Sequence, residues 1–449
     1  MKLPPYVSEF MNSFASHGFQ IYVVGGAVRN LFLGKISTNW DFTTNAKPEQ
    51  ILSLFPNSFY HNQYGTVTVR YGTNAEYLFE VTPFRKEGSY SDGRHPDSIV
   101  WAETIEEDLQ RRDFTINAMA YDGTTLIDLF HGKRDLDEKR IVTVGDPDKR
   151  FEEDALRLIR AVRFASQLGF FIDESTRTSV QKNSERIKQV SWERIRDEFM
   201  HILASDHPSE GVLFLKNLNL LQYLLPEVDL CFLIPQKSPK RHHIYDVGTH
   251  LVMALKHCPS TDPITRFATL LHDIGKAQTF RRDDESGIIT FYNHEVVGAE
   301  LTAQIADRFR LSTKDKEKLV TLVAKHQFTV SEMQTDKAVK RFIREVGKEH
   351  IQSMIDLRTG DRLGSGSTPT SWRLELFKKR IEEVQHEPFQ IKDLKISGYD
   401  IMEQLHLKPG PRIGEILTAL FEKVENKQLP NEKEALMNEI IKYDRSEKH

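Results

Sequence analysis

A short β-branched segment that ends on two glycines constrains this chain more than any other feature. Residues Ile21–Val24 predict a buried strand, and Gly25 and Gly26 follow directly. Because glycine has no Cβ, such a turn lets backbone N–H groups approach an anion closely, and Arg29 is near enough to pair with a phosphate. Asp41 lies in the next short segment, where a carboxylate could hold a divalent cation against that phosphate. The pattern predicts a phosphate-and-metal site, although two glycines alone also fit an ordinary strand, turn and helix.

The length and composition indicate several domains of a soluble protein. A chain of 449 residues is too long for one core and should divide into roughly three or four domains. The net charge of −4 means that any nucleic-acid surface must be a local patch. Two cysteines, Cys231 and Cys258, are too few for a disulfide framework. The chain shows neither a signal core nor a membrane-spanning run, so we expect no membrane contact and a cytoplasmic location.

The distribution of strand and helix patterns changes near Pro147. Before it, the sequence predicts a helix over residues 1–20, with Phe10, Met11 and Phe14 packed inward, and then mainly strands. After it, apolar residues recur with helical spacing almost to the end of the chain. The polar segment 234–243 is expected to be a linker. The predicted strands cover residues 21–24, 66–70, 77–82 and 125–129.

Six motifs occur in a fixed order in the first 165 residues. Together they resemble the class II tRNA nucleotidyltransferases, a family of CCA-adding enzymes and bacterial poly(A) polymerases. The resemblance implies an α+β fold that begins with a mixed-sheet nucleotidyltransferase palm. The motifs are GGAVRN (25–30), NWDFTT (39–44), YGTV (64–67), EVTPFR (80–85), RRDFTINAMA (111–120) and EEDALRLIRAVRFA (152–165).

The resemblance implies a metal-dependent nucleotide transfer. A primer 3′-hydroxyl would attack the α-phosphorus of CTP or ATP, and carboxylates would hold Mg²⁺ at the reacting phosphate. In the family these carboxylates are a D-x-D pair and a third acidic residue on a neighbouring strand. Asp41 matches the second member of the pair and Glu80 the third, but Asn39 stands where the first aspartate is expected. A neutral amide oxygen should hold the metal more weakly than a carboxylate.

Two further motifs are expected to read the nucleotide. RRDFTINAMA resembles the ribose-reading motif, which would place Arg112 and Asp113 near the 2′-hydroxyl with Asn117 in support. Asp154 and Arg157 are three apart, so we expect them on one helix face, where they could hydrogen-bond the edge of a base. The ordinary alternatives are a helix cap for Asp113 and an ion pair within one helix for Asp154 and Arg157. The expected nucleotide-binding set is Gly25, Gly26, Arg29, Arg112, Asp113, Asn117, Asp154, Arg157, Arg160 and Arg163.

A polar, glycine-bearing loop over residues 84–98 bears on which nucleotides are added. Within the resemblance, enzymes that add only CC tend to lack this loop, which is present here and contains Arg85. Its presence therefore favours full CCA addition or addition of the terminal A. The basic segment that marks bacterial poly(A) polymerases is absent from residues 61–70.

A second group of residues suits a separate metal site in residues 244–365. Neutral imidazoles and carboxylates are good ligands for transition metals or Mg²⁺. The order of these residues resembles the HD metal-dependent phosphohydrolases, and the additional His294 and His326 imply a site for two metals. A lone histidine would more often be a core residue, and His242 and His243 are by default linker residues. The expected ligands are His250, His272, Asp273, His294, His326 and Asp361, with Lys276 close by.

The two resemblances together imply four domains and a tRNA-processing enzyme. The tail segment around Lys408 and Arg412 resembles the turn that contacts the tRNA backbone. HD domains attached to CCA-adding enzymes are associated with phosphate-ester hydrolysis at RNA ends. The expected domains are the head (1–146), a helical neck that contains the nucleobase-recognition motif (147–233), the HD body (234–365) and the tRNA-binding tail (366–449).

Three alternatives follow from the same residues. The first is an enzyme that adds only A to tRNA ending in CC. In the second, the HD domain is active while Asn39 impairs the head. In the third, the protein binds RNA without catalysis. The full set of predicted HD ligands argues against it, as do the intact head and neck residues Asp41, Arg112, Asp113, Asp154 and Arg157.

Overall fold

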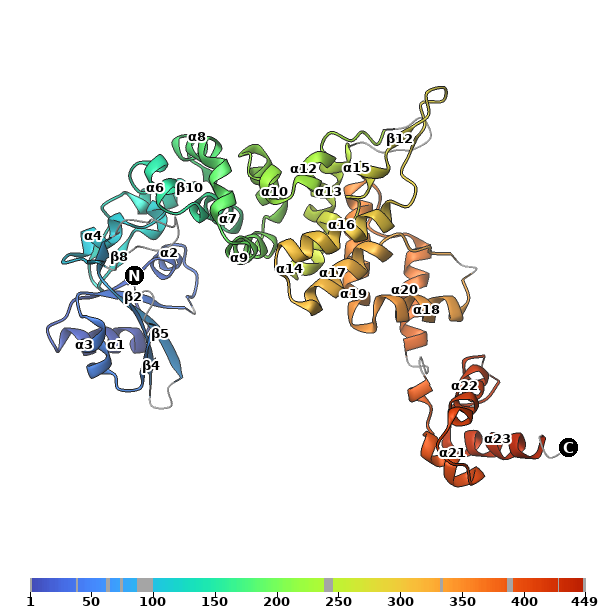
Figure 1. Ribbon diagram of the computed structural model, residues 1–449. Coiled ribbons are helices and arrows are strands. Elements are labelled where there is room, and N and C mark those ends of the chain that lie inside the picture. Colours follow the sequence, from blue (N-terminus) through green and yellow to red (C-terminus); the bar gives the residue numbers. More distant parts are fainter. Residues whose placement is uncertain are drawn as a thin grey trace.

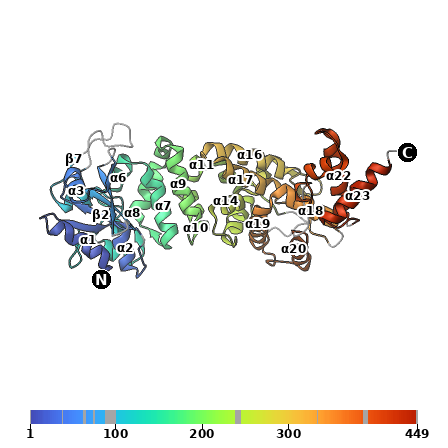
Figure 2. The same cartoon turned by 90° about the horizontal axis from the view of Figure 1, so that it is seen from below.

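A computed structural model describes residues 2–37, 39–61, 65–72, 76–86, 100–237, 245–331, 334–385, 391–426 and 428–446. The domains follow one another along an elongated, curved molecule, as Figures 1 and 2 show. The sheet lies at the N-terminal end, and the last helices lie at the opposite end. The α+β fold predicted from the sequence is confirmed.

The head contains a seven-stranded mixed sheet in the order β3-β4-β5-β2-β1-β8-β9. The predicted strands at 21–24, 66–70 and 77–82 are confirmed, whereas the strand predicted at 125–129 is only two residues long and three other strands of the sheet were missed. The strands are β1 (Ile21–Val24), β2 (Asp41–Thr44), β3 (Ser58–His61), β4 (Thr66–Tyr71), β5 (Tyr77–Pro83), β8 (Ala120–Tyr121) and β9 (Leu126–Ile127).

Helix α1 (Pro5–Ala15) covers one face of this sheet. It is shorter than the predicted helix over 1–20, but Phe10, Met11 and Phe14 are buried as expected. Their helical spacing forms one apolar stripe, and the ring of Phe10 packs 4.9 Å from that of Phe42 on β2. The other head elements are α2 (Gly26–Phe32), α3 (Pro48–Leu54), β6 (Arg85–Lys86), β7 (Val100–Trp101), α4 (Ile105–Gln110), the 3₁₀ helix η1 (Thr115–Asn117) and α5 (Gly132–Asp137).

The neck and body helices share one hydrophobic core, which extends from Phe114 to Val384. The short parallel pair β10 (Arg140–Ile141) and β11 (Phe171–Ile172) joins the end of the head to the neck. The neck helices are α6 (Pro147–Glu153), α7 (Leu156–Leu168), α8 (Glu174–Asn183), η2 (Ser184–Gln189), α9 (Trp192–Leu203), α10 (Pro208–Asn217), α11 (Leu221–Leu224) and α12 (Pro226–Cys231).

The body continues this core and ends in a helix that packs back onto it. Helix α20 lies beyond the expected boundary at 365, yet its Phe377, Ile381 and Val384 belong to the shared core. The body elements are α13 (Val247–Lys256), α14 (Pro263–Leu271), α15 (Lys276–Thr279), β12 (Arg281–Arg282), β13 (Ile289–Thr290), α16 (His294–Arg308), α17 (Thr313–Lys325), α18 (Asp336–Val346), η3 (Lys348–His350), α19 (Ile351–Gly364) and α20 (Trp372–Gln385).

The tail has a small core of its own, which contains Ile401, Leu420, Leu436 and Ile440. In the described part of the chain, no helix is long and apolar enough to cross a bilayer. The tail elements are η4 (Ile391–Asp393), α21 (Gly398–Leu405), α22 (Pro411–Glu425) and α23 (Lys433–Ser446).

Candidate functional site

Two carboxylates of the head are brought together by strand register. Strands β2 and β5 run parallel, and Asp41 pairs directly with Glu80. Burial raises the pKa of Asp41, the charge of Glu80 raises it further, and Arg112 offsets part of the effect. Two neighbouring carboxylates that repel each other are an arrangement that a bound cation stabilises.

The first glycine of the turn allows an arginine and a carboxylate to approach from either side. Gly25 has φ of +65°, a conformation that favours glycine. A Cβ at this position would lie 3.4 Å from Nη1 of Arg112 and 3.9 Å from Oδ2 of Asp41. The turn therefore lies directly beside the carboxylate pair, as its place in the sequence predicts.

Gly26 and Arg29, the other two residues expected at the phosphate site, lie against each other. A Cβ on Gly26 would come within 3.4 Å of Nη2 of Arg29. The Arg29 guanidinium donates to Oδ1 of Asn117 at 2.7 Å and lies near the ring of Phe164. Burial lowers the pKa of Arg29. Arg29 thus links the glycine turn to the predicted ribose motif.

Asn39 lies just outside strand β2, with its side chain exposed. Its backbone carbonyl accepts a hydrogen bond of 2.6 Å from the hydroxyl of Ser37. The position is two residues before Asp41 in the chain, and its amide side chain carries no formal charge.

A buried aspartate that sequence reasoning missed holds two arginines of the ribose motif. Asp108 accepts from Nε and Nη2 of Arg111 at 2.9 and 2.7 Å, and from Nη2 of Arg112 at 3.1 Å. Burial opposes the charged form of Asp108, but the two guanidinium groups outweigh burial and lower its pKa. The spacing of three and four residues within EEDLQRR is the signal that could have found it.

Asp113 is a buried ion-pair partner and not a helix cap. Its Oδ2 accepts from Nε and Nη2 of Arg160 at 2.9 and 2.6 Å. Burial disfavours the charge, yet Arg160 outweighs burial and the pKa of Asp113 is lowered to about 2. Asn117 donates to the other oxygen at 3.4 Å, in keeping with the supporting position expected for it.

The arginines Arg160 and Arg163 converge on one acid of helix α9, Glu198. Arg160 Nη1 lies 3.4 Å from Oε1 of Glu198, and Arg163 Nε lies 3.0 Å from Oε2. Burial and the neighbouring Arg160 lower the pKa of Arg163 to about 10. Sequence reasoning missed Glu198, because it lies 35 residues beyond Arg163 and only the packing of α9 against α7 brings it near.

Asp154 and Arg157 do not share a helix face, and the expectation that they do is wrong. Asp154 is extended, with φ of −146°, between the end of α6 and the start of α7. Its Oδ2 accepts from Nη2 of Arg194 at 2.8 Å, while Arg157 pairs with Glu153 at 2.6 Å. The Asp154 carboxylate therefore lies at the break between α6 and α7, and the Arg157 guanidinium lies beyond it. Each pairs with a residue that sequence reasoning missed.

Arg85 begins β6, which pairs with β7 through Trp101. Its backbone N–H donates to Oδ1 of Asp108 at 3.4 Å, so the start of the predicted loop is tied to the ribose motif. Most of the predicted loop, from residue 87 onward, lies outside the described residues.

The predicted ligands of the second site meet among the body helices. The six residues come from or next to five different helices, so helix packing brings them together. They are His250 on α13, His272 and Asp273 after α14, His294 at the start of α16, His326 at the end of α17 and Asp361 on α19.

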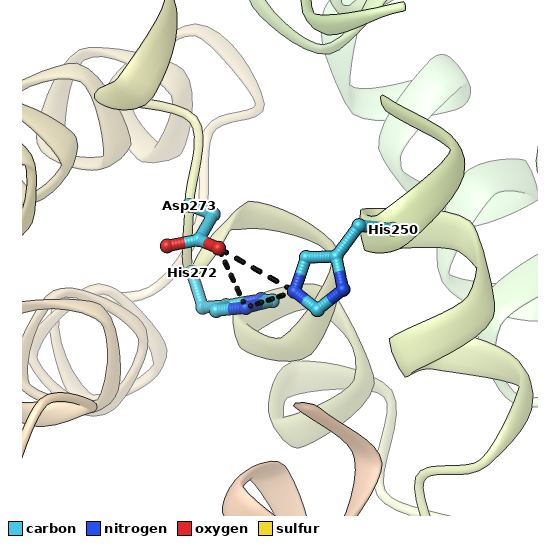
Figure 3. A group of neighbouring side chains, drawn as sticks. All are labelled: His250, His272 and Asp273. Carbon is cyan, nitrogen blue, oxygen red and sulfur yellow. Dashed lines mark hydrogen bonds and ion pairs between the residues drawn. The ribbon is translucent and has the colours of Figure 1, made fainter. Parts of the chain in front are cut away.

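Asp273 lies between two groups of imidazoles. Its Oδ2 is 3.4 Å from Nε2 of His250 and 3.3 Å from Nε2 of His272, a group that Figure 3 shows. Its Oδ1 is 3.1 Å from Nε2 of His294 and 3.5 Å from Nε2 of His326. The structure therefore forms two sets of three ligand atoms that share one carboxylate.

Three of the histidines are oriented in the same way by the backbone. His272, His294 and His326 each donate from Nδ1 to the carbonyl three residues earlier, at 2.7 Å. Because a carbonyl can only accept, Nδ1 carries a proton, and Nε2, which faces Asp273, is the nitrogen that a bound metal could take. Nε2 of His250 and His272 lie only 3.1 Å apart, an approach that a shared cation would stabilise. These donors fit one or two divalent metals.

The carboxylates of this centre remain charged, and a cavity opens beside them. Burial opposes the charge of Asp273, but Lys276, with Nζ at 2.6 Å, and the imidazoles keep its pKa well below the usual range. Burial likewise opposes the charge of Asp361, whose pKa the histidines lower. A cavity of about 590 Å³ adjoins the centre and is also lined by Arg358 and Arg362.

The remaining predicted residues lie at the surface or outside the described chain. Lys408 and Arg412 are exposed on either side of the turn between α21 and α22. In contrast, Arg380 of α20 forms an ion pair of 2.7 Å with Asp336 of α18 and so links these two body helices. His242 and His243 lie outside the described residues.

Three family models match the chain in the order of these domains. They are the "Poly A polymerase head domain" over residues 21–142, the "Probable RNA and SrmB-binding site of polymerase A" over 169–231 and the "tRNA nucleotidyltransferase domain 2" over 299–440.

Curated proteins and solved structures resemble the chain over almost its whole length. A CCA-adding enzyme of Lactococcus lactis subsp. cremoris (strain MG1363) is 30% identical over 98% of both chains. One from Levilactobacillus brevis (strain ATCC 367) is 33% identical over 94% of this chain and 93% of its own. The crystal structure of Bacillus stearothermophilus CCA-adding enzyme in complex with CTP superimposes with a TM-score of 0.73 at 25% identity, over 99% of both chains.

Proposed function

The chain belongs to the family of CCA-adding enzymes, and on that premise we propose that it builds or repairs the 3′-terminal CCA of tRNA from CTP and ATP. The observation that carries this proposal is the direct pairing of Asp41 with Glu80 beside the turn at Gly25. This places two carboxylates and a backbone turn where a triphosphate and its cations could be held together. Family membership implies a divalent metal, generally Mg²⁺, at this point.

In the proposed reaction, the tRNA 3′-hydroxyl attacks the α-phosphorus and pyrophosphate leaves. Bound Mg²⁺ would neutralise the negative charge that gathers on the phosphate oxygens. Asp41 and Glu80 would hold the cations, and Asn39 would contribute a neutral oxygen. Arg112, adjoining Gly25, would contact the triphosphate or the ribose, while the Asp108 and Asp113 ion pairs keep the arginines of this region in place.

For base selection we propose Asp154 and Arg157. A carboxylate accepts from the exocyclic amino group that both cytosine and adenine carry, and a guanidinium donates to an adjacent ring acceptor. In the structure Asp154 is paired with Arg194 and Arg157 with Glu153. The incoming base would therefore replace part of an existing ion-pair network, which keeps the edge-reading groups oriented before it binds.

The test is single-nucleotide gel analysis of a tRNA that lacks its 3′ CCA, with Mg²⁺ and with CTP, ATP or both. Extension by three nucleotides with both triphosphates is expected. Extension by ATP alone of a CC-ended tRNA, with no other addition, would instead identify an A-adding enzyme. No extension, even after Asn39→Asp, would exclude addition by the head.

Lys408 and Arg412 are proposed to contact the tRNA backbone, so tRNA binding should weaken with salt.

We propose a second activity, metal-dependent phosphate-ester hydrolysis, for the centre in the body. The observation that favours it is the pair of three-ligand sets sharing Asp273, next to a cavity with two arginines. Two divalent metals held there would supply charge neutralisation and an activated water. Water attacks phosphorus, the P–O ester bond breaks, and the departing oxygen takes a proton. Release of phosphate, or opening of a 2′,3′-cyclic phosphate at an RNA end, with Mn²⁺, Ni²⁺ or Mg²⁺ tests it.

A further inference from the structure

One exposed aromatic side chain lines the cavity of the body centre. Tyr292 lies in the short connection between β13 and α16, two residues before the ligand His294, and 77% of it is exposed. Among the described residues, no other ring stacks on Tyr292. A large ring left in water contributes little to folding, so its place at a reactive centre calls for another explanation.

The backbone on both sides of Tyr292 is held in place. Phe291 is buried, and its carbonyl accepts the 2.7 Å hydrogen bond from Nδ1 of His294. Asn293 has φ of +59°, a left-handed conformation that a non-glycine residue keeps only where its surroundings require it. Its carbonyl accepts from the N–H groups of Val296 and Val297 at 3.1 and 3.2 Å. The Tyr292 backbone is thus positioned relative to the metal centre while its ring remains exposed.

A different element supplies positive charge to the same cavity. Arg358 on α19 lies 3.3 Å from the ligand Asp361, and Arg362, one turn further, donates to the carbonyls of Thr368 and Thr370 at 3.1 Å each. Guanidinium groups bind phosphate oxygens well. The cavity therefore combines the proposed metal ligands, two arginines and one free aromatic face. Its volume of about 590 Å³ lies within the range of about 300–1,000 Å³ typical of small-molecule sites.

We propose that Tyr292 is the platform on which a nucleobase stacks, so that the cavity takes a phosphate carried by a nucleoside in preference to a small phosphate ester. This inference rests on the proposed hydrolase activity and adds its substrate class. Base–aromatic stacking tolerates all four bases because each has a π-face, so the subsite should accept purines and pyrimidines. A free nucleoside monophosphate and the last nucleotide of an RNA share this chemistry.

The test compares two substrates in three variants of the full chain. The substrates are adenosine 3′-monophosphate and glycerol 2-phosphate, which lacks a base, each with Mn²⁺. Tyr292→Ala removes the ring, and Tyr292→Phe keeps it. Phe171→Ala is the matched control, because Phe171 is a similarly exposed ring (72%) on β11 in the neck.

We expect Tyr292→Ala to raise KM for the nucleotide by about 5- to 150-fold, the factor that corresponds to loss of one stacked base. The value of kcat should change little. Glycerol 2-phosphate should be hydrolysed with unchanged kinetics, and Tyr292→Phe and Phe171→Ala should match the parent protein. An equal loss on both substrates, or no change on the nucleotide, would overturn the inference. A short RNA with a 3′-phosphate, competed with the free nucleotide, shows which of the two sources is preferred.

Equilibrium dialysis of adenosine 3′-monophosphate provides a readout that does not depend on turnover. The head contributes equally to the parent protein and to Tyr292→Ala, so any difference in binding reports on the cavity. If the parent protein hydrolyses neither substrate with Mn²⁺, Ni²⁺ or Mg²⁺, the proposed hydrolase activity is wrong. Weaker nucleotide binding by Tyr292→Ala would still support the base subsite, and equal binding would exclude it.

Discussion

Asp41 on β2 lies directly opposite Glu80 on β5 in the parallel strand pair of the head sheet. Every other pair of neighbouring strands in this sheet is antiparallel. Parallel pairing places the two side chains on the same face, because register partners in adjacent strands point the same way. Burial raises the pKa of Asp41, and the charge of Glu80 raises it further.

We predict that Asp41→Asn abolishes nucleotide addition, with a loss of at least about 100-fold, since a cation at the reacting phosphate contributes several kcal/mol. Asp137→Asn is the matched control, because Asp137 is an exposed acid of the same head, paired with Lys133.

Conversely, Asn39→Asp should lower the Mg²⁺ concentration for half-maximal activity by about fivefold or more, the factor that corresponds to about 1 kcal/mol of stronger Mg²⁺ binding. Gel extension assays over a Mg²⁺ titration measure both. An unchanged Mg²⁺ requirement would mean that residue 39 is remote from the cation.

Gly25→Ala should impair both folding and addition. Its φ of +65° strains any residue with a Cβ, and that Cβ would crowd Arg112. We expect a destabilisation of about 1–2 kcal/mol, measured by urea unfolding, and weaker triphosphate binding. Gly414→Ala on α22 is the control, because a Cβ there meets open space, and it should stabilise by about 0.5–1 kcal/mol. Normal CTP affinity in Gly25→Ala would argue against the turn as part of the phosphate site.

Asp154→Ala should lower kcat/KM for CTP and ATP by about 10- to 150-fold, because a hydrogen bond to a charged group contributes about 1.5–3 kcal/mol. Discrimination against UTP and GTP should fall as well. Arg177→Ala is the control in the same neck, since Arg177 is exposed and pairs with Glu174 on α8, away from this break. Incorporation of each triphosphate is measured separately. Unchanged selectivity in Asp154→Ala would mean that other groups read the base.

The buried pair of Asp113 and Arg160 should make the head and neck sensitive to acid. The pKa of Asp113 is about 2 in the folded protein and 3.8 ordinarily. A lowered carboxyl pKa stabilises the folded state fully above pH 3.8, and this stabilisation, about 2 kcal/mol, is lost as the pH falls towards 2. Asp113→Asn should therefore lower the urea midpoint at pH 6 and flatten its dependence between pH 4 and 2. If Asp113→Asn in an Arg160→Gln background behaves in the same way, the ion pair is not the cause.

Metal content should follow the two ligand sets that share Asp273. We predict about two divalent ions per chain in the parent protein and about one in His294→Ala, which removes one ligand from one set. His201→Ala is the control, because His201 is an exposed histidine on α9. Elemental analysis gives the content, and a chelator should lower Tm by removing ions that bind only the folded state. A chain that retains no metal after purification and reconstitution would rule out this centre.

Sequence reasoning predicted the histidines and the aspartate that meet in the body centre from their residue types and from the resemblance to the HD phosphohydrolases. An adjacent histidine and aspartate at the end of an apolar helix, with further histidines at helix ends, already indicate the chemistry. Asp41 and Glu80 were expected because short local motifs resemble those of the nucleotidyltransferase family. The prediction was wrong for Asp154, which was expected within a helix and instead lies between α6 and α7. The reason is that a helix end depends on the packing of both helices as well as on propensity.

Residue types, motif order and local periodicity determined the α+β fold, the carboxylates of the head and the ligands of the body. Each of these motifs can be recognised in a short segment of the chain, although only strand register and helix packing bring their residues together. Only the tertiary structure decided which charges pair, because Glu198 and Arg194 of α9 reach Arg160, Arg163 and Asp154 only when α9 packs against α7. It also decided that Tyr292 is exposed in the cavity beside the proposed ligands of the body. The energies of such pairs and surfaces depend on distance and burial, which arise only after the helices have packed.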